Sequence, residues 1–309
     1  NIRYYKYHQN IISSYNLFLE GIDFEPKTII RFGRKPTSKI LCQIINNHDR
    51  VLYVDNYEKF NDNSTHPIKS DVNYFTDYII NNSPIVEKNI NLDKMKIMQN
   101  KINPFIKNIS FDNYNCEGAI INNILDSINT PANIFIGNSM AIREMDDFSI
   151  NLDKKIKIYC NRGASGIDGL VSTGLGIAYS DKQKINISII GDLSFYHDMN
   201  GLLNSNKMNI NMKFIILNNN GGGIFSQLDI AKLNYDKFKE FWTTPLDLDI
   251  KQIADLYKLK YTKIKNTDDL KKISSITNKT EIFDYQISII ESMKNKEKIL
   301  NEVKNLIKN

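Results

Sequence analysis

Short apolar runs alternate with amphipathic stretches along most of this chain. Five runs rich in β-branched residues have the length and pattern of buried strands: 133–137, 157–160, 185–190, 213–217 and 281–290. Apolar spacing or short helix-like patterns predict helices at 114–129, 170–178, 195–205, 250–257 and 292–308. Strands that alternate with helices are typical of parallel sheets, so the pattern predicts an α/β fold.

The first third of the chain shows less of this pattern. Strands are expected at 28–32 and 51–55, with a helix between them that begins near Thr37 or Ser38. Two strands and one helix make half of a doubly wound domain. Residues 81–110 are polar and contain Pro84 and Pro104, which predicts a linker with room for a short helix. We therefore expect a partial domain at 1–80, a linker at 81–110 and a second domain at 111–309.

Polar residues follow two of the expected strands where each strand ends. Gly191-Asp192 comes after the run 185–190, and Asn219 with the glycines 221–223 comes after the run 213–217. In an open parallel sheet, ligands bind at these strand ends. A carboxylate, amide oxygens and a backbone carbonyl suit Mg²⁺, which commonly also binds phosphate oxygens. These residues predict a magnesium-diphosphate site, although an ordinary pair of α/β turns would show a similar pattern.

Three separated motifs make the prediction more specific. They are IRFGRKPTSK at 30–39, NRGASGIDGLVSTGLGIA at 161–178, and GDLSFYHD with NNNGGGIFS within 191–226; Asn219 follows Asp192 by 27 residues. Together they resemble the thiamine-diphosphate-dependent 2-succinyl-5-enolpyruvyl-6-hydroxy-3-cyclohexene-1-carboxylate synthase family, over most of residues 15–260. Leu193 stands where thiamine-diphosphate enzymes usually have the second glycine of Gly-Asp-Gly, and this departure is itself similar to that family.

The resemblance implies a role for each motif. It implies a parallel-sheet domain of the diphosphate-binding type at 111–309, preceded by part of a middle α/β domain. It implies a substrate-carboxylate site made by Ser139, Arg143 and Arg162, and Mg²⁺ or Mn²⁺ held by Asp192, Asn219 and Gly221. The residues expected to contact thiamine diphosphate are Ile167, Gly191, Asp192, Leu193, Ser194, Phe195, Asn219, Gly221, Gly222, Ile224 and Phe225.

Each of these assignments has a plainer structural alternative. Ser139 and Arg143 would otherwise be a helix-start serine and a surface arginine. Ile224 and Phe225 would otherwise be core residues that open a helix. His197, which follows Asp192 closely, is either a proton carrier near the site or a residue outside it.

The same resemblance implies a reaction and partners. The substrates would be 2-oxoglutarate and isochorismate, joined in menaquinone or phylloquinone biosynthesis in the bacterial cytoplasm or plastid stroma. Such enzymes take an activating glutamate from an N-terminal pyrimidine-binding domain, which we expect to be absent from this chain. We therefore expect a C-terminal fragment or split subunit that is inactive alone, and a homo-oligomer (dimer or tetramer) or a pairing with a chain that carries that domain. The rival hypotheses are another 2-oxoacid decarboxylase, an acetolactate-type synthase, or a non-catalytic partner subunit.

Composition narrows the classes of partner. The net charge of +5 is spread along the 309 residues, so no nucleic-acid partner is expected. Three distant cysteines form no metal or disulfide pattern, and no apolar run is long enough to span a membrane. The lysines of 292–308 are expected to form a solvated face, and His66 to lie in a surface connector. Arg31, Arg34 and Lys35 are expected to be solvated loop charges, with an anion site as the alternative.

Overall fold

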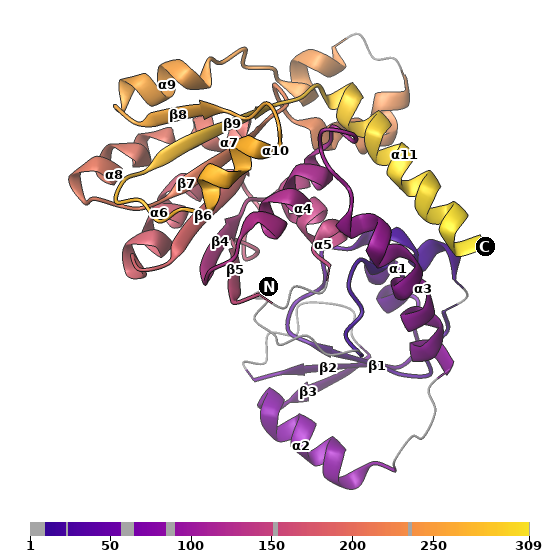
Figure 1. Ribbon diagram of the computed structural model, residues 1–309. Coiled ribbons are helices and arrows are strands. Elements are labelled where there is room, and N and C mark those ends of the chain that lie inside the picture. Colours follow the sequence, from indigo (N-terminus) through magenta and orange to yellow (C-terminus); the bar gives the residue numbers. More distant parts are fainter. Residues whose placement is uncertain are drawn as a thin grey trace.

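The computed structural model describes residues 10–22, 24–56, 65–84, 90–150, 154–233 and 237–308. Two sheets, both wholly parallel, form its framework (Figure 1). The larger has the strand order β5-β4-β6-β7-β9-β8 and the smaller has the order β1-β2-β3. The strands are β1 Ile29–Phe32, β2 Val51–Asp55, β3 His66–Lys69, β4 Ala132–Ile136, β5 Ile156–Cys160, β6 Ile185–Gly191, β7 Lys213–Asn218, β8 Lys260–Lys263 and β9 Glu281–Gln286. The predicted parallel α/β fold is confirmed.

Helices cover both faces of the larger sheet. The α-helices are α1 Lys39–Asn46, α2 Val72–Asn82, α3 Ile90–Lys107, α4 Glu117–Ser127, α5 Met140–Phe148, α6 Leu170–Ser180, α7 Asp192–His197, α8 Leu203–Lys207, α9 Ile250–Leu256, α10 Thr267–Leu270 and α11 Ile289–Lys308. Alternate residues of each strand enter different cores, because successive side chains point to opposite faces. Ile189 of β6 belongs to the core that includes α4 and α5, and Ile190 belongs to the core that includes α6.

Strand order determines where a ligand site forms. The chain passes from β4 to β5 on one side and then returns to β6 on the other side of β4. This reversal opens a crevice at the carboxyl ends of β4 and β6, the usual binding position in open parallel sheets. After β6 the chain passes through α7 and α8 to β7, which pairs with β6 so that Gly191 lies opposite Leu217. The polar ends of both strands are therefore neighbours.

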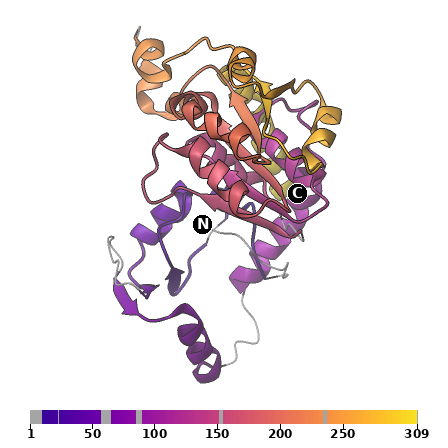
Figure 2. The ribbon, with the colours of Figure 1, turned by 90° about the vertical axis from the view of Figure 1, so that its left-hand side faces the viewer.

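The smaller sheet lies below the larger body in Figures 1 and 2. Its α1 begins after Ser38, whose side chain accepts a hydrogen bond from the Leu41 N–H, as the sequence predicted for this helix start. The interpretation of His66 as part of a connector was wrong, because it begins the edge strand β3, although its side chain is exposed. Short polar edge strands such as HPIK lack the apolar run on which strand prediction depends.

The segment predicted as a linker is largely one long helix. α3 has 18 residues, and its Ile102 and Ile106 are fully buried in the same core as α4. Gln99 of α3 also accepts a hydrogen bond from the Ser13 N–H at 2.6 Å. The expectation of at most a short helix was wrong, because a narrow apolar stripe is hidden among lysines and asparagines. The division into two domains remains a prediction.

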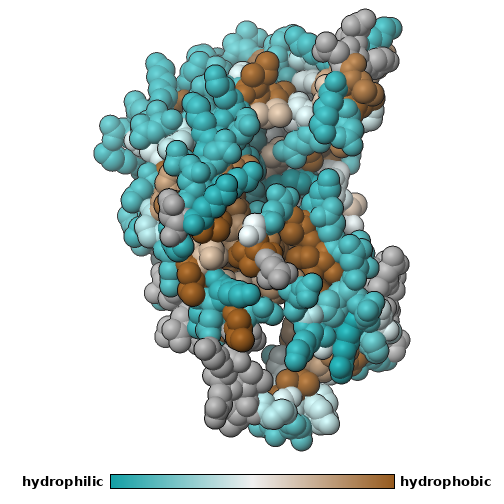
Figure 3. Space-filling view, turned by 90° about the vertical axis from the view of Figure 1, so that its right-hand side faces the viewer, coloured by the Kyte–Doolittle hydropathy of each residue, from teal (hydrophilic) through white to brown (hydrophobic). Residues whose placement is uncertain are grey.

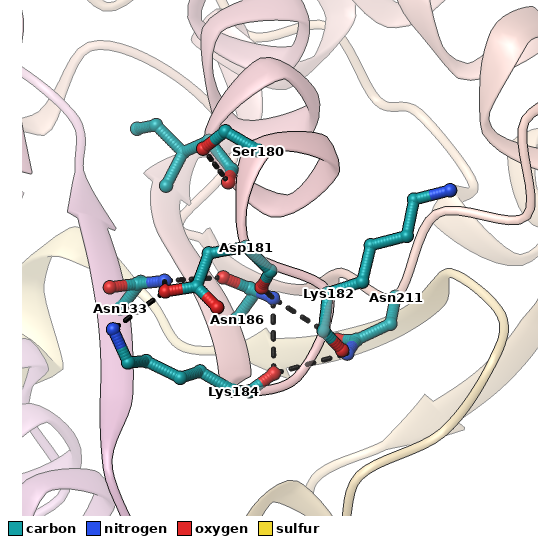
Figure 4. Close-up of polar contacts among 8 residues, drawn as sticks. Asn133, Ser180, Asp181, Lys182, Lys184, Asn186 and Asn211 are labelled. Carbon is teal, nitrogen blue, oxygen red and sulfur yellow. Dashed lines mark hydrogen bonds and ion pairs between the residues drawn. The ribbon is translucent and has the colours of Figure 1, made fainter.

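Three buried asparagines join the amino ends of β4, β6 and β7. Asn133 donates to the Asn186 side chain at 3.0 Å, and Asn186 donates to the carbonyls of Asp181 and Lys184 (Figure 4). Asn211 donates to the carbonyl of Lys184 at 3.0 Å. This network hydrogen-bonds the turn before β6 at the end of the sheet opposite the crevice, and it explains how asparagines fit inside apolar runs.

Among the described residues, no helix is long and apolar enough to cross a membrane.

Candidate active site

A cavity of about 320 Å³ lies at the carboxyl ends of β4, β5, β6 and β7. It collects side chains from motifs that are far apart in the sequence. The expected site residues that line it are Ser139, Arg143, Arg162, Ile167, Gly191, Asp192, Leu193, Ser194, Asn219, Gly221, Gly222, Ile224 and Phe225. The structure therefore brings together nearly all of the residues that the sequence assigned to one site.

Two candidates lie elsewhere. Phe195 does not line the cavity; its ring is fully buried and packs against Phe214 with the centroids 6.2 Å apart. Its role is in the core, because α7 turns this side chain toward the sheet. His197 is exposed at the end of α7, with Nδ1 3.7 Å from a carboxylate oxygen of Asp168, and it does not line the cavity either.

Ile224 and Phe225 are not core residues. Both lie in a short 3-10 turn, Gly223–Gln227, and both line the cavity. Phe225 is 36% exposed and packs edge-on against Trp242, with ring centroids 5.6 Å apart. The structural alternative considered for these two residues was therefore wrong.

Asp192 connects the two strand ends. One carboxylate oxygen accepts the Leu193 N–H at 2.9 Å, and the other accepts the Gly221 N–H at 2.8 Å. Burial raises the pKa of Asp192 to about 6, although these backbone N–H groups oppose the rise. A carboxylate desolvated in this way is poised to bind a cation.

Asn219 has one satisfied and one unsatisfied polar atom. Its Nδ2 donates to Glu117 Oε1 at 2.7 Å. Its Oδ1 is buried and accepts no hydrogen bond within the part of the chain that the structure describes. A buried oxygen without a partner requires an explanation, and a bound ion is one of the usual ones.

The oxygen atoms of this site suit a divalent cation such as Mg²⁺. No group of three or more His, Cys, Asp or Glu side chains among the described residues could hold a metal ion. The available oxygen atoms are instead the Asp192 carboxylate, Asn219 Oδ1 and the Gly221 carbonyl. Such a small hard-oxygen set suits Mg²⁺ or Mn²⁺ with further oxygens from phosphate and water.

The glycine run has a packing role of its own. Gly221 has φ +136°, and a Cβ built there would lie 2.2 Å from the Thr243 carbonyl oxygen. The Gly222 N–H donates to that same oxygen at 2.7 Å. The turn Lys239–Thr243 therefore presses directly on the glycines, which only residues without a side chain permit.

Two arginines give one side of the cavity a positive charge. Arg143 Nη1 donates to the Ser139 carbonyl at 2.6 Å, and Arg162 Nη1 donates to Asn138 Oδ1 at 3.0 Å. Burial and then the neighbouring Arg162 lower the pKa of Arg143. Neither arginine forms an ion pair with a carboxylate of the described residues, so both retain the capacity to bind an anion.

Several lining residues escaped the sequence analysis. They are Glu117, Met140, Ala141, Ser165 and Leu217. Met140 and Ala141 could have been found, since they directly follow Ser139 after the end of β4. Glu117 gives no such signal, because it begins α4, far from the motifs in sequence. Burial, with a contribution from Glu144, raises its pKa to about 7.

Comparison with known proteins agrees with this geometry. Residues 153–280 match the family model for the C-terminal TPP-binding domain of thiamine pyrophosphate enzymes. The chain is also 35% identical over 286 residues to 2-succinyl-5-enolpyruvyl-6-hydroxy-3-cyclohexene-1-carboxylate synthase of Staphylococcus aureus strain MRSA252. The chain is therefore similar in sequence to thiamine pyrophosphate enzymes. The predicted resemblance to this synthase family is confirmed.

The match covers most of this chain and half of its relatives. It spans 90% of this chain and 49% of the MRSA252 synthase, with the same coverage and 35% identity for strain JH9 and 34% for strain USA300. The chain therefore spans about half the length of the curated relatives that it matches.

Substitutions of Glu117 test whether this residue orients the Asn219 side chain for metal binding. We expect Glu117→Leu to weaken Mn²⁺ binding about 10- to 100-fold, because the Asn219 amide loses the acceptor that orients it. Glu117→Gln retains an acceptor oxygen and should stay within about fivefold of wild type. Electron paramagnetic resonance of free Mn²⁺ measures both, and equal losses in the two variants would contradict an orienting role.

Proposed function

We propose that this chain binds thiamine diphosphate through a divalent cation and contributes to a 2-succinyl-5-enolpyruvyl-6-hydroxy-3-cyclohexene-1-carboxylate synthase. In that role it joins decarboxylated 2-oxoglutarate to isochorismate in menaquinone biosynthesis. The observation that carries the proposal is that Asn219 Oδ1, which accepts no hydrogen bond from any described residue, lies in one cavity with the desolvated Asp192 carboxylate. The names of its relatives and the matched TPP-binding domain point to the same cofactor.

The cofactor and metal would use the strand ends of β6 and β7. Asp192, Asn219 and the Gly221 carbonyl would hold Mg²⁺ or Mn²⁺, and the metal would hold the diphosphate. When bound, thiamine diphosphate supplies the nucleophilic carbon and the electron sink for decarboxylation of a 2-oxoacid. Ile224 and Phe225 present apolar surface to this part of the cavity and would shape the space for the cofactor rings.

The arginines would bind the substrates. Both proposed substrates carry carboxylates, and a guanidinium can bind a carboxylate through two parallel hydrogen bonds. Arg143 and Arg162 lie on the same cavity as the metal-binding oxygens, with Ser139 beside Arg143. The positive charge of the two arginines would orient an anionic substrate toward the cofactor.

A chain that carries an N-terminal pyrimidine-binding domain would complete the site. The resemblance implies that the activating glutamate comes from the N-terminal domain, and this chain spans half the length of its relatives. One face carries apolar side chains gathered in and around a hollow (Figure 3), a feature of surfaces that contact another molecule. We infer a homo-oligomer, or a pairing with a chain that carries an N-terminal pyrimidine-binding domain. The S. aureus relatives are bacterial, which favours the bacterial cytoplasm over the plastid stroma.

Assays of the chain alone and with a complementing chain test the proposal. Alone, with thiamine diphosphate, Mg²⁺, 2-oxoglutarate and isochorismate, we expect no turnover above background. Addition of the N-terminal half of the S. aureus relative should restore product formation. Turnover of the chain alone at the rate of a full-length synthase would contradict the need for a partner.

Substrate exchange separates this function from its rivals. Consumption of pyruvate in preference to 2-oxoglutarate by the complemented enzyme would identify another 2-oxoacid decarboxylase or an acetolactate-type synthase. Cofactor binding without turnover of either oxoacid would favour a non-catalytic partner subunit. Trp242 reports binding directly, because it is the only tryptophan and packs on Phe225 in the cavity wall.

A further inference from the structure

Arg143 lies one helical turn from a carboxylate with which it does not pair. Asp147 follows it by four residues on α5, the spacing at which opposite charges meet on a helix surface. Yet Arg143 donates to the Ser139 carbonyl and has no ion pair with a described carboxylate. Glu144, the adjacent residue, is a weaker competitor because neighbours in sequence do not share a helix face.

Asp147 has both of its oxygens occupied by other donors. Asn16 Nδ2 donates to Oδ1 at 2.8 Å, and Lys296 Nζ donates to Oδ2 at 3.0 Å. Lys296 also bonds Glu144 Oε1 at 2.5 Å. The side chains of Glu144 and Asp147 are only 2% and 12% exposed, so these pairs are largely withdrawn from water.

Lys296 reaches this point from the far end of the chain. It lies on α11, which runs beside the body of the protein in Figure 1, and the expectation of a wholly solvated lysine face is wrong at this residue. Arg143, Asp147 and Lys296 all line a second cavity of about 660 Å³. Arg143 lines this cavity and the one with the metal-binding oxygens, so its orientation matters to both.

We propose that Lys296 is a positioning residue that keeps Arg143 free to bind an anion, by occupying the Asp147 carboxylate. Without Lys296, a buried acceptor one turn away would compete for the guanidinium, since Arg–carboxylate pairs are strong and often bidentate. The anion that Arg143 binds would be a substrate carboxylate, and this part of the inference rests on the proposed function. A purely structural role, the docking of α11 on α5, is the alternative.

Binding of 2-oxoglutarate to the full chain, loaded with thiamine diphosphate and Mg²⁺, tests the inference by calorimetry. We expect Lys296→Met to weaken binding about tenfold, which corresponds to one lost charge-assisted contact. The double variant Lys296→Met with Asp147→Asn should return to within about threefold of wild type, because asparagine no longer competes for the arginine. Lys294→Met, an exposed lysine on the same helix, is the matched control and should bind as wild type does.

Crystal structures of the variants provide a readout that needs no ligand. Arg143 should lie within ion-pair distance of Asp147 in Lys296→Met and should keep its Ser139 contact in the double variant. If Lys296→Met does not fold, Asn16→Ala exposes the other oxygen of Asp147 and should weaken binding about threefold, with the same rescue by Asp147→Asn.

The outcomes separate the inference from the function on which it rests. Wild-type affinity in Lys296→Met with Arg143 unmoved would overturn the positioning role, and so would a loss that Asp147→Asn does not rescue. A wild-type chain that binds no 2-oxoglutarate would overturn the substrate assignment of Arg143. The Arg143 geometry in the variant structures would still decide the role of Lys296.

Discussion

Asp192→Asn is expected to remove Mg²⁺-dependent binding of thiamine diphosphate, with an affinity at least about 100-fold lower than that of wild type. The substitution keeps the size of the side chain and one acceptor oxygen for the backbone N–H groups of Leu193 or Gly221. It removes the negative charge that attracts the cation. A titration followed by Trp242 fluorescence, with and without Mg²⁺, measures the loss.

The pH dependence of the same titration provides a control. Burial raises the pKa of Asp192 to about 6, and a metal ligand must be deprotonated. Mg²⁺ affinity should therefore be high above pH 7 and fall as the pH decreases through about 6. In Asp192→Asn this pH-dependent component should disappear. Equal cofactor affinity in wild type and Asp192→Asn would show that Asp192 is not a metal ligand.

Gly221→Ala should destabilise the fold by about 3 kcal/mol or more, because two penalties add. Its φ of +136° disfavours any side chain, and the new Cβ would lie 2.2 Å from the Thr243 carbonyl oxygen. Relief requires the Lys239–Thr243 turn to move, which also breaks the hydrogen bond from the Gly222 N–H. Urea unfolding measures the change.

Gly176→Ala is the matched control for this prediction. Gly176 lies inside α6, and a Cβ at that position meets no atom within 4 Å. The alanine should stabilise the chain by roughly 0.5–1 kcal/mol, through its higher helix propensity. A Gly221→Ala protein with the same free energy of unfolding as wild type would contradict this prediction, because the Lys239–Thr243 turn would then move aside without loss of stability.

The residues of the strand ends were predictable because chemistry and sequence position coincide there. Asp192 and Asn219 follow apolar runs that can only be buried strands, and parallel strands bring their carboxyl ends to one edge. Glu117 and Lys296 were not predictable, since each reaches its partner through tertiary packing across more than 100 residues of sequence. No local pattern records such a contact.

Errors in the fold have a similar origin. α3 buries a stripe so narrow that its polar composition dominated the prediction, and Phe195 belongs to the core although it stands within the motif. Both errors concern which way a side chain points. Neither composition nor membership of a motif indicates whether a side chain points into the core. Helix periodicity does indicate it when the apolar stripe is wide.

The asparagine network at the amino ends of β4, β6 and β7 has a consequence for protein engineering. It stabilises the end of the sheet that is remote from the cavity, through hydrogen bonds in which no residue lining the cavity takes part. Residues around Arg162 and Ile167 can therefore be varied to accept other oxoacids while this anchorage is left untouched. The scaffold separates the part that tolerates redesign from the part that must be preserved.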